Sequence, residues 1–477
     1  MATVVQYPAR SGRSSELVLL VAAILVGVGG YLSVMASHPE APATTWYWHC
    51  AAIAICGVGA HVALRFLAPY ADPVILPITL ALNGMGLAMI ARLDLYYTEM
   101  GTDAALSQVR GNSQLIYMIG GGVILIAVLV LFRDHRTFRK FSWVSLVLGI
   151  FLMLATLIPG LGVKSYGSYI SVSLFGISIQ PNEFAKILLA IFFAGYLEYR
   201  RDSLAIAGKK VGFLQLPRWR DFLPIGVVWV AALGLLVIQK DLGSALLIFS
   251  VFVGVLYVAT DRPSWLVFGA VLLAPIAVVA YSMFTHLQQR VTNWLHAFDP
   301  KIMDCNQIGG SCQLVKGLFG MAYGGLTGAG WGRGMPGLTP LANSDFIVAS
   351  LAEELGLTGM MAFFMFYLIL VSRGLRTALG VRDGFGKLLA TALTFSIGAQ
   401  LFIVVGGITR IIPSTGLTAP FVAAGGASLL ANWIGIAILL RISDSARRPL
   451  PPPLAEKSTQ AAAGVITEAP TERVVRA

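Results

Sequence analysis

The chain has 477 residues, of which 57% are hydrophobic and only 12% carry a charge. This charged share is about half of the usual value for a soluble domain, so the composition excludes a water-soluble protein and predicts one that lies in a membrane. It also excludes a disordered chain, a collagen and a disulfide scaffold, apart from the tails. The net charge of +11 does not by itself indicate nucleic acid, because membrane proteins collect Lys and Arg on their cytoplasmic loops.

Apolar stretches, taken in chain order, predict twelve transmembrane helices, since a span needs about 20 mostly apolar residues. They are residues 16–37, 46–67, 73–93, 114–132, 142–158, 183–199, 222–239, 242–260, 265–285, 345–372, 388–408 and 419–441. The tight turn at residues 239–241 either separates two of these spans or interrupts a single region. We therefore predict an all-α polytopic membrane protein with a large extracellular loop between the ninth and tenth spans.

The distribution of basic residues predicts that both termini are cytoplasmic. With this orientation, 24 of the 34 Lys and Arg residues lie on the cytoplasmic side, nine lie outside and Lys186 lies within a span. This asymmetry explains the basic balance without a nucleic-acid partner. After Ser443 the sequence becomes rich in Pro and then in Ala, Thr and Glu, which predicts a disordered cytoplasmic tail over residues 444–477.

Two predicted outer loops, residues 159–182 and 286–344, are longer than helix connections require. The second carries nine Gly between Gly317 and Gly337, and it is either a flexible linker or a surface where bare backbone approaches a ligand. It also contains Cys305 and Cys312, for which an oxidising exterior favours a disulfide and the alternative is two free thiols. The six His are scattered, so the sequence predicts no metal site.

Several ionisable residues are predicted at the membrane edge. Gln180 and Glu183 stand at the start of the sixth span, where Glu suits the positive helix end. Lys186 follows within the first turns, and it pairs with Glu183, snorkels outward or meets an anionic ligand. Before the tenth span, either Ser344 or Asp345 is a candidate N-cap, and the alternative for Asp345 is a catalytic role.

Other charged residues complete this outward-facing set. Glu353 and Glu354 lie roughly 12 Å further along the helix that follows Asp345, where two adjacent carboxylates need a polar cavity or cationic partners. Asp241 and Arg410 are also predicted at the outer face.

These stretches together resemble the SEDS family of cell-wall proteins, the RodA/FtsW/SpoVE type. Residues 180–186 are similar to the family segment Q-P-[SA]-E-x-x-K, and residues 239–245 to Q-P-D-L-G-T-[AS] with Lys240 in place of Pro. Residues 324–328 match G-G-L-x-G, and residues 344–356 match the family's T-D-F-I-F-A-x-x-x-E-E-L-G. Residues 413–428, which end at Ser428, match P-x-T-G-x-x-L-P-[FL]-x-S-[YG]-G-G-S.

The sequence also departs from the family pattern. The segment G-A-x-R-W-I reads here as residues 167–171 without Arg or Trp, so the role of that Arg is missing or falls to Lys164. The Glu and His that precede the family's Asp are absent at residues 341 to 344. The resemblance covers residues 72–443, which leaves residues 1–71 as a tail with two additional helices. The residues at the motif positions most resemble those of the actinobacterial RodA-like branch.

The resemblance implies a plasma-membrane peptidoglycan glycosyltransferase that polymerises lipid II, releases undecaprenyl pyrophosphate and serves cell elongation. Such an enzyme needs one base for the attacking hydroxyl, for which Asp345 is the candidate, and cations for the pyrophosphate. The candidate cations are Lys186 first, then Lys164, Lys240, Arg290 and Lys316. Further expected substrate contacts are Gln180, Glu183, Asp241, Glu353, Glu354 and Ser428.

The resemblance also implies a partner, a single-pass class B penicillin-binding protein that crosslinks the new glycan. A divalent cation such as Mg²⁺ or Mn²⁺ is an expected assistant at the pyrophosphate, although the sequence shows no dedicated site. Two other classes of function remain open: a flippase that carries lipid II across the bilayer and a non-catalytic scaffold. Against the flippase, the unusual polar residues cluster at the outer face and not at the midplane, where carriers bind.

Overall fold

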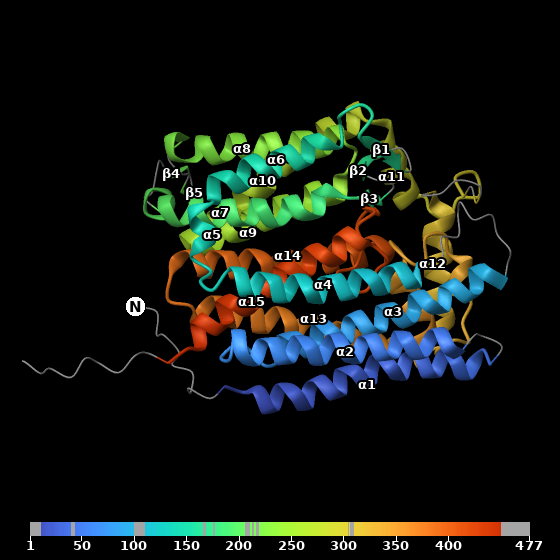
Figure 1. The fold of residues 1–477 in the computed structure, drawn as a ribbon. Helices are drawn as coiled ribbons and strands as arrows, with labels where there is room; N and C mark the ends of the chain where they lie inside the picture. Colours follow the sequence, from blue (N-terminus) through green and yellow to red (C-terminus); the bar gives the residue numbers. More distant parts are fainter. Residues whose placement is uncertain are drawn as a thin grey trace, which may run out of the picture. The chain divides into compact units, whose positions relative to one another are not determined.

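Long helices that follow the apolar stretches of the sequence dominate the computed structural model of the chain (Figure 1). The structure describes residues 11–39, 43–99, 110–165, 168–174, 177–205, 210–211, 214–215, 219–303, 305 and 310–449. Its long helices are α1 (Arg13–Ser37), α2 (Ala43–Leu67), α3 (Ile75–Glu99), α4 (Gly111–Leu131), α7 (Pro181–Ala205), α8 (Trp219–Ile238), α9 (Leu242–Thr260), α10 (Ser264–Met283), α13 (Ile347–Gly380), α14 (Gly384–Ile408) and α15 (Gly426–Arg447). The shorter ones are α5 (Thr137–Lys140), α6 (Ser142–Ala155), α11 (Thr285–Leu295), α12 (Ser311–Gly324) and the 3₁₀ helix η1 (Pro336–Leu338).

Nine helices within these ranges are long and apolar enough to cross a membrane, which makes the chain a multi-pass membrane protein. They are α1, α2, α3, α4, α9, α10, α13, α14 and α15. The remaining predicted spans coincide with α6, which has 14 residues, and with α7 and α8. The count of twelve spans therefore stays a prediction.

The helices pack in layers around α13, α14 and α15 (Figure 1). On one side α3 packs on α13 and α4 on α15, with α1 and α2 beyond them. On the other side α7 and α9 pack on α14, and they are followed by α6, α8 and α10. The span of α3 is buried along its whole length, whereas little of the span of α10 is buried, as is expected for a helix that contacts lipid.

Small residues bring the amino-terminal helices onto this core. A β-carbon on Gly84 of α3 would lie only 2.8 Å from the Cα of Gly27 on α1, so the two backbones meet in contact, as is usual between membrane helices. Near the start of α1, buried Glu16 accepts a hydrogen bond from Nδ1 of His61 on α2 (2.7 Å) and pairs with Arg13. Helices α1 and α2 are thus part of the packed bundle.

The loop at residues 159–182 folds into a small antiparallel sheet that the all-α prediction did not include. Its strands are β1 (Gly162–Ser165), β2 (Ser168–Leu174) and β3 (Ile177–Ile179), in that order. Val172 pairs with Gly162 on one side and with Ile179 on the other. The alternation of Ile and Val with Ser in this stretch is a strand pattern. A second sheet pairs β4 (Lys210–Val211) with β5 (Leu214–Gln215).

The two ends of the bundle differ (Figure 1). The three-stranded sheet, α11 and α12 lie at one end, which we call the sheet end, and α5 with β4 and β5 lies at the other. Helix α15 continues to Arg447, four residues beyond the predicted end of the core at residue 443. The predicted disordered tail over residues 450–477 lies outside the described residues.

Candidate active site

A cavity of about 490 Å³ lies at the sheet end, within the range of volumes that small-molecule sites occupy. Its walls come from β2, the turn between α8 and α9, α11, the segment before α13, the end of α14 and residues 414–417. The polar side chains that line it include Lys240, His286, Gln289, Arg290, Gln313 and Asp345. The fold therefore brings three of the predicted site residues, Asp345, Lys240 and Arg290, to one cavity.

Asp345, the candidate base of the expected reaction, lies just before α13. The N-cap of α13 is Phe346, and Leu341 turns the preceding segment with a φ of 55°. Burial raises the pKa of Asp345 to about 7, against the lowering effect of the Arg290 charge and of a hydrogen bond with Ser344. The raised pKa makes this carboxylate more basic than an ordinary Asp, which suits a general base near neutral pH.

Gly416 marks the place where Asp345 and Arg290 approach each other. A β-carbon on Gly416 would lie 3.6 Å from Asp345 Oδ2 and 3.7 Å from Arg290 Nη2. Its φ of 75° also belongs to the left-handed region that glycine adopts at little cost. Arg290 donates from Nη1 to the carbonyl of Ser414 (3.1 Å), so α11 is tied to the same wall.

Lys240 lies in the turn between α8 and α9 with a φ of 63°, an unusual conformation for a residue with a side chain. The neighbouring sheet holds this turn, because Tyr169 N–H donates to the carbonyl of Gln239 (3.1 Å). Asp241 follows as the N-cap of α9 and accepts from Ser244 N–H (3.0 Å) and from Asn182 Nδ2 (3.1 Å). Asp241 thus has structural partners; a substrate contact by it stays a prediction.

A second polar cluster joins other predicted residues below the cavity. Lys186 Nζ lies 2.6 Å from Glu183 Oε2 and donates to Gln400 Oε1 on α14 (2.9 Å). Gln400 Nε2 in turn donates to the carbonyl of Thr418 (2.8 Å), whose hydroxyl donates to Ser428 Oγ (3.2 Å). Gln180 directly precedes α7 and is half-buried.

Glu353 and Glu354 are buried on α13 and face the glycine-rich loop. Glu354 lies 3.4 Å from Arg92 Nε and accepts from Gly332 N–H (2.9 Å), while Glu353 accepts from Met335 N–H (2.6 Å). The cationic partner that two adjacent carboxylates require is thus Arg92 of α3. A contact of Glu353 or Glu354 with substrate stays a prediction.

The glycines of this loop meet another part of the chain's own backbone. Helix α13 is broken at Gly356, and a β-carbon there would lie 2.1 Å from the Gly328 nitrogen. Across the break, Ala329 N–H donates to the carbonyl of Glu353 and Leu357 N–H to that of Gly325, both at 3.0 Å. Glycine is needed here because two bare backbones approach each other.

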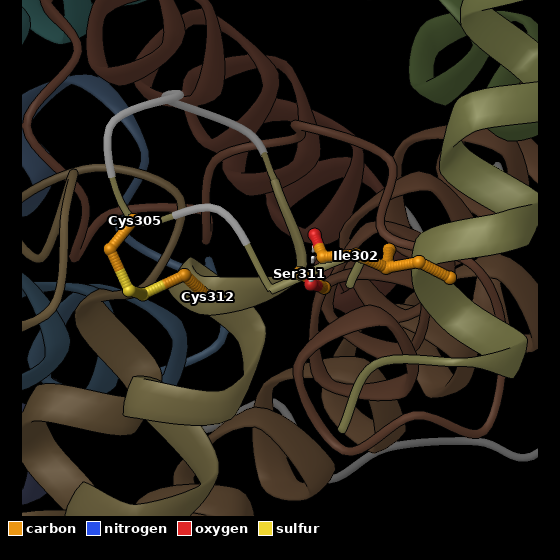
Figure 2. The surroundings of a disulfide bond; sticks show 4 residues. All are labelled: Ile302, Cys305, Ser311 and Cys312. Carbon is orange, nitrogen blue, oxygen red and sulfur yellow. Dashed lines mark hydrogen bonds between the residues drawn. A yellow bond between two sulfur atoms is a disulfide. The ribbon is translucent and has the colours of Figure 1, made fainter. Parts of the chain in front are cut away.

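The two remaining predicted cations belong to elements of the sheet end. Lys164 belongs to β1, but its side chain lies outside the described residues, and Lys316 is half-buried on α12. Figure 2 shows Cys305 and Cys312 joined by a disulfide at the start of α12. Beside it, Ser311 Oγ donates to the carbonyl of Ile302 (3.0 Å).

No three His, Cys, Asp or Glu side chains in the described ranges lie close enough to form a metal site of their own. The side chains present do not fit a protein-held metal ion, and a divalent cation bound with the pyrophosphate stays a prediction.

Five polar residues that were not predicted from the sequence lie in or next to the site. His286, Gln289 and Asn293 share one face of α11 with Arg290, and their spacing of three or four residues was a readable signal. Gln313 at the start of α12 and Gln400 within α14 carry no comparable pattern, because each acts across elements distant in sequence.

Over residues 73–448 the chain matches the FtsW/RodA/SpoVE family, described as "Cell cycle protein". The chain belongs to this family. Among its relatives, the peptidoglycan glycosyltransferase RodA of Mycobacterium tuberculosis is 43% identical over 460 residues, which are 96% of each chain. That of Mycobacterium leprae is 40% identical over 448 residues, 93% of each chain. A probable peptidoglycan glycosyltransferase FtsW of Geobacter metallireducens is 31% identical and covers 78% of this chain and 94% of its own.

Two solved structures share the fold. A chain from a peptidoglycan synthase complex, studied for the coordination of polymerization and crosslinking, gives a TM-score of 0.57 at 22% identity and covers 76% of this chain and 98% of its own. The rod shape determining protein RodA of Thermus thermophilus gives 0.53 at 21% identity, covering 80% and 98%. This family member is thus a glycosyltransferase with several membrane-spanning helices. The mycobacterial similarity covers so much of the chain that it includes α1 and α2, which precede the family match.

Proposed function

We propose that this chain polymerises lipid II into peptidoglycan glycan strands, releases undecaprenyl pyrophosphate and serves cell elongation. The observation that carries the proposal is the cavity at the sheet end, where one carboxyl group, Asp345, faces two cations, Lys240 and Arg290. A lipid-linked substrate places its pyrophosphate at the membrane surface, and the cavity lies at the end of the bundle where spans begin and end. The mycobacterial relatives, named peptidoglycan glycosyltransferase RodA, support the glycosyltransferase activity.

Asp345 would act as the general base. As the hydroxyl of the acceptor sugar attacks the anomeric carbon of the donor sugar, its proton passes to the Asp345 carboxylate. A new carbon–oxygen bond forms while the bond from the anomeric carbon to the pyrophosphate oxygen breaks, and its electron pair leaves with the pyrophosphate. The leaving group is already a stabilised anion, so no strong acid is required.

Lys240 and Arg290 would hold the departing pyrophosphate, since fixed cations stabilise charge that develops in the transition state. Lys240 and Arg290 line the cavity, which supports them ahead of Lys186 and Lys316. Lys164, whose side chain lies outside the described residues, stays a candidate. A divalent cation would arrive with the pyrophosphate and lower its negative charge. The steps above are carried by the side chains of the chain itself.

The sheet end would face the outside of the cell, and both termini would be cytoplasmic. All nine Lys and Arg residues predicted outside would then share the cavity's side of the membrane. The partner would be a class B penicillin-binding protein, which crosslinks the strands. Support comes from the solved complex of similar fold, whose description joins polymerization with crosslinking.

The test is polymerisation of labelled lipid II by the purified protein in detergent, where there is no bilayer to cross. We expect glycan strands of many disaccharides and one undecaprenyl pyrophosphate released for each glycosidic bond formed. A flippase or a scaffold would leave lipid II unchanged under these conditions, and that result would overturn the proposal.

A further inference from the structure

Gln400 connects two regions that the proposed reaction treats separately. It is fully buried on α14, one turn before Val404 and two turns before Ile408, which both line the cavity. Its side chain accepts from Lys186 Nζ (2.9 Å) and donates to the carbonyl of Thr418 (2.8 Å). The side-chain amide of Gln400 thus lies between the Lys186–Glu183 ion pair and the segment that forms one wall of the cavity.

The wall formed by residues 414–417 has no regular secondary structure and depends on side contacts. Arg290 holds it at Ser414, and the backbone of α9 approaches it so closely that a β-carbon on Gly243 would lie 2.9 Å from the Thr415 carbonyl oxygen. Irregular backbone among membrane helices must have its polar groups satisfied within the protein. Gln400 supplies that partner for the carbonyl of Thr418, directly after the wall.

The position of Gly416 makes this support relevant to chemistry. Gly416 lies against both Asp345 and Arg290, so a displacement of the wall changes the space between base and cation. Lys186 and Glu183, by contrast, do not line the cavity and are bound to each other. A cation engaged in this way orients the oxygen of Gln400 and leaves its amide nitrogen directed at Thr418.

We propose that Gln400 is a positioning residue of the polymerase. Its side chain connects the Lys186–Glu183 ion pair to the cavity wall and so keeps Gly416 next to Asp345. Lys186 then acts through Gln400 and does not hold the pyrophosphate itself. This inference rests on the proposed function, because it is measured by polymerisation.

The test compares Gln400→Met, the paired variant Glu183→Gln/Lys186→Met, and their combination. Removing both members of the ion pair avoids leaving one buried charge alone. For Gln400→Met we expect kcat to fall by about 10- to 100-fold with KM for lipid II nearly unchanged, because a small misplacement near the reacting groups has effects of this size. The combined variant should be no slower than Gln400→Met, since groups that act in series give non-additive effects.

A matched control comes from Gln114 of α4, which binds the same connecting segment further along. It donates to the carbonyl of Ala423 (3.0 Å) and accepts from Gly425 N–H (3.2 Å), away from the cavity wall. Gln114→Met should lower thermal stability about as much as Gln400→Met but leave kcat within about twofold of wild type. Equal losses of kcat in both variants would mean general loosening of the segment and would overturn the inference.

Two further readouts separate positioning from simple support. The pH dependence of kcat should move in Gln400→Met, because the surroundings of Asp345 change, and should stay in place in Gln114→Met. Multiplicative losses in the combined variant, with KM raised by Glu183→Gln/Lys186→Met, would instead assign Lys186 to the substrate. If Gln400→Met does not fold, Gln400→Glu, which keeps the size of the side chain, takes its place in the same series. Wild-type protein that does not polymerise lipid II contradicts the proposed function; active wild type with normal kcat in the Gln400 variants contradicts only this inference.

Discussion

At the scale of single residues, Asp345 is exposed to opposing influences. Burial disfavours its charge and Arg290 favours it, and burial prevails, because the pKa is raised to about 7. The folded state therefore binds a proton that the unfolded chain would release above its ordinary pKa, so this group stabilises the fold less as the pH rises toward 7. The same property gives the carboxylate the basicity that proton transfer needs.

The first prediction concerns the chemical identity of this side chain. Asp345→Asn keeps its size but cannot accept a proton, so turnover should fall by about 10²-fold or more while folding and lipid II binding remain normal. Because the N-cap of α13 is Phe346, we expect little loss of helix stability. Labelled lipid II polymerisation and a thermal melt measure the two effects. Glu353→Gln, on the same helix, is the control; turnover of Asp345→Asn within a few-fold of wild type would end the assignment and direct attention to Asp241.

The second prediction is a pH profile. Since only ionised Asp345 can act as base, kcat/KM, which reports the ionisation of the free enzyme, should rise with pH through an apparent pKa of about 7 and level off above it. Initial rates between pH 5.5 and pH 9, in roughly half-unit steps, define this limb. The limb should be absent from the residual activity of Asp345→Asn. A wild-type rate that is flat over this range would show that Asp345 does not titrate during turnover.

The third prediction tests the contact at Gly416. Alanine there would place a methyl carbon 3.6 Å from Asp345 Oδ2 and 3.7 Å from Arg290 Nη2. It would also occupy a φ of 75°, which costs about 1 kcal/mol or more. In Gly416→Ala, both the rate of polymerisation and the thermal stability should fall. Gly59→Ala serves as comparison, because no heavy atom lies within 4 Å of the added carbon. Normal polymerisation by Gly416→Ala would mean that the base and the cation need not approach each other.

At the scale of elements, the segment between α10 and α13 is held by several local contacts. α11 presents a polar face to the cavity, and α12 begins at the disulfide between Cys305 and Cys312. The glycine-rich part then fills the break in α13 and is tied to Glu353 and Glu354. Each constraint keeps the long connection close to the helix that begins beside Asp345.

The fourth prediction concerns the disulfide. Peptide mass spectrometry of protein purified without reductant should find one bridged peptide containing Cys305 and Cys312. Since the bridge closes a short loop, its loss in Cys305→Ser should cost about 2–3 kcal/mol at most and act locally on α12. Alkylation of both thiols in unreduced material would contradict the pairing. Cys50 and Cys56, which are free, provide the internal reference for alkylation.

At the scale of the whole molecule, the orientation in the membrane gives the fifth prediction. In a variant without Cys50 and Cys56, a cysteine in place of exposed Arg333 should react with an impermeant maleimide in sealed cells. A cysteine in place of Arg136, exposed at the opposite end, should react only after permeabilisation. This outcome follows from the excess of basic residues at the end of the bundle that carries Arg136. Labelling of position 136 from outside in sealed cells would contradict the predicted topology.

The amino-terminal helices also belong to this scale. The resemblance to the family left residues 1–71 as a tail with two additional helices, and the structure packs α1 against α3 and α2 against α4. The carboxyl-terminal end of α1 reaches the glycine-rich loop, where Ser37 Oγ donates to the carbonyl of Trp331 (3.1 Å). One face of α1 is thereby engaged in the bundle, while its exposed apolar side chains face outward.

Much of the fold and some of the site could be predicted from the sequence by itself. Apolar stretches indicate where membrane helices run, because the lack of water in a bilayer forces local, intrahelical hydrogen bonding. Family membership, later confirmed, could be predicted because its motifs are short and contiguous, as in residues 180–186. Asp345 stood out in the same way, as an acidic residue directly before an apolar run.

Only the tertiary structure decided which polar residues meet. Lys186 and Lys240 look alike in sequence, yet one pairs with Glu183 beneath the cavity and the other lines it. The glycine-rich loop could be taken for a ligand-binding surface until its backbone was found against the break at Gly356. Such contacts join elements far apart in the chain, and their partners are set by how helices pack. A pattern of neighbouring residues carries local preferences, whereas burial and pairing of charge depend on the whole bundle.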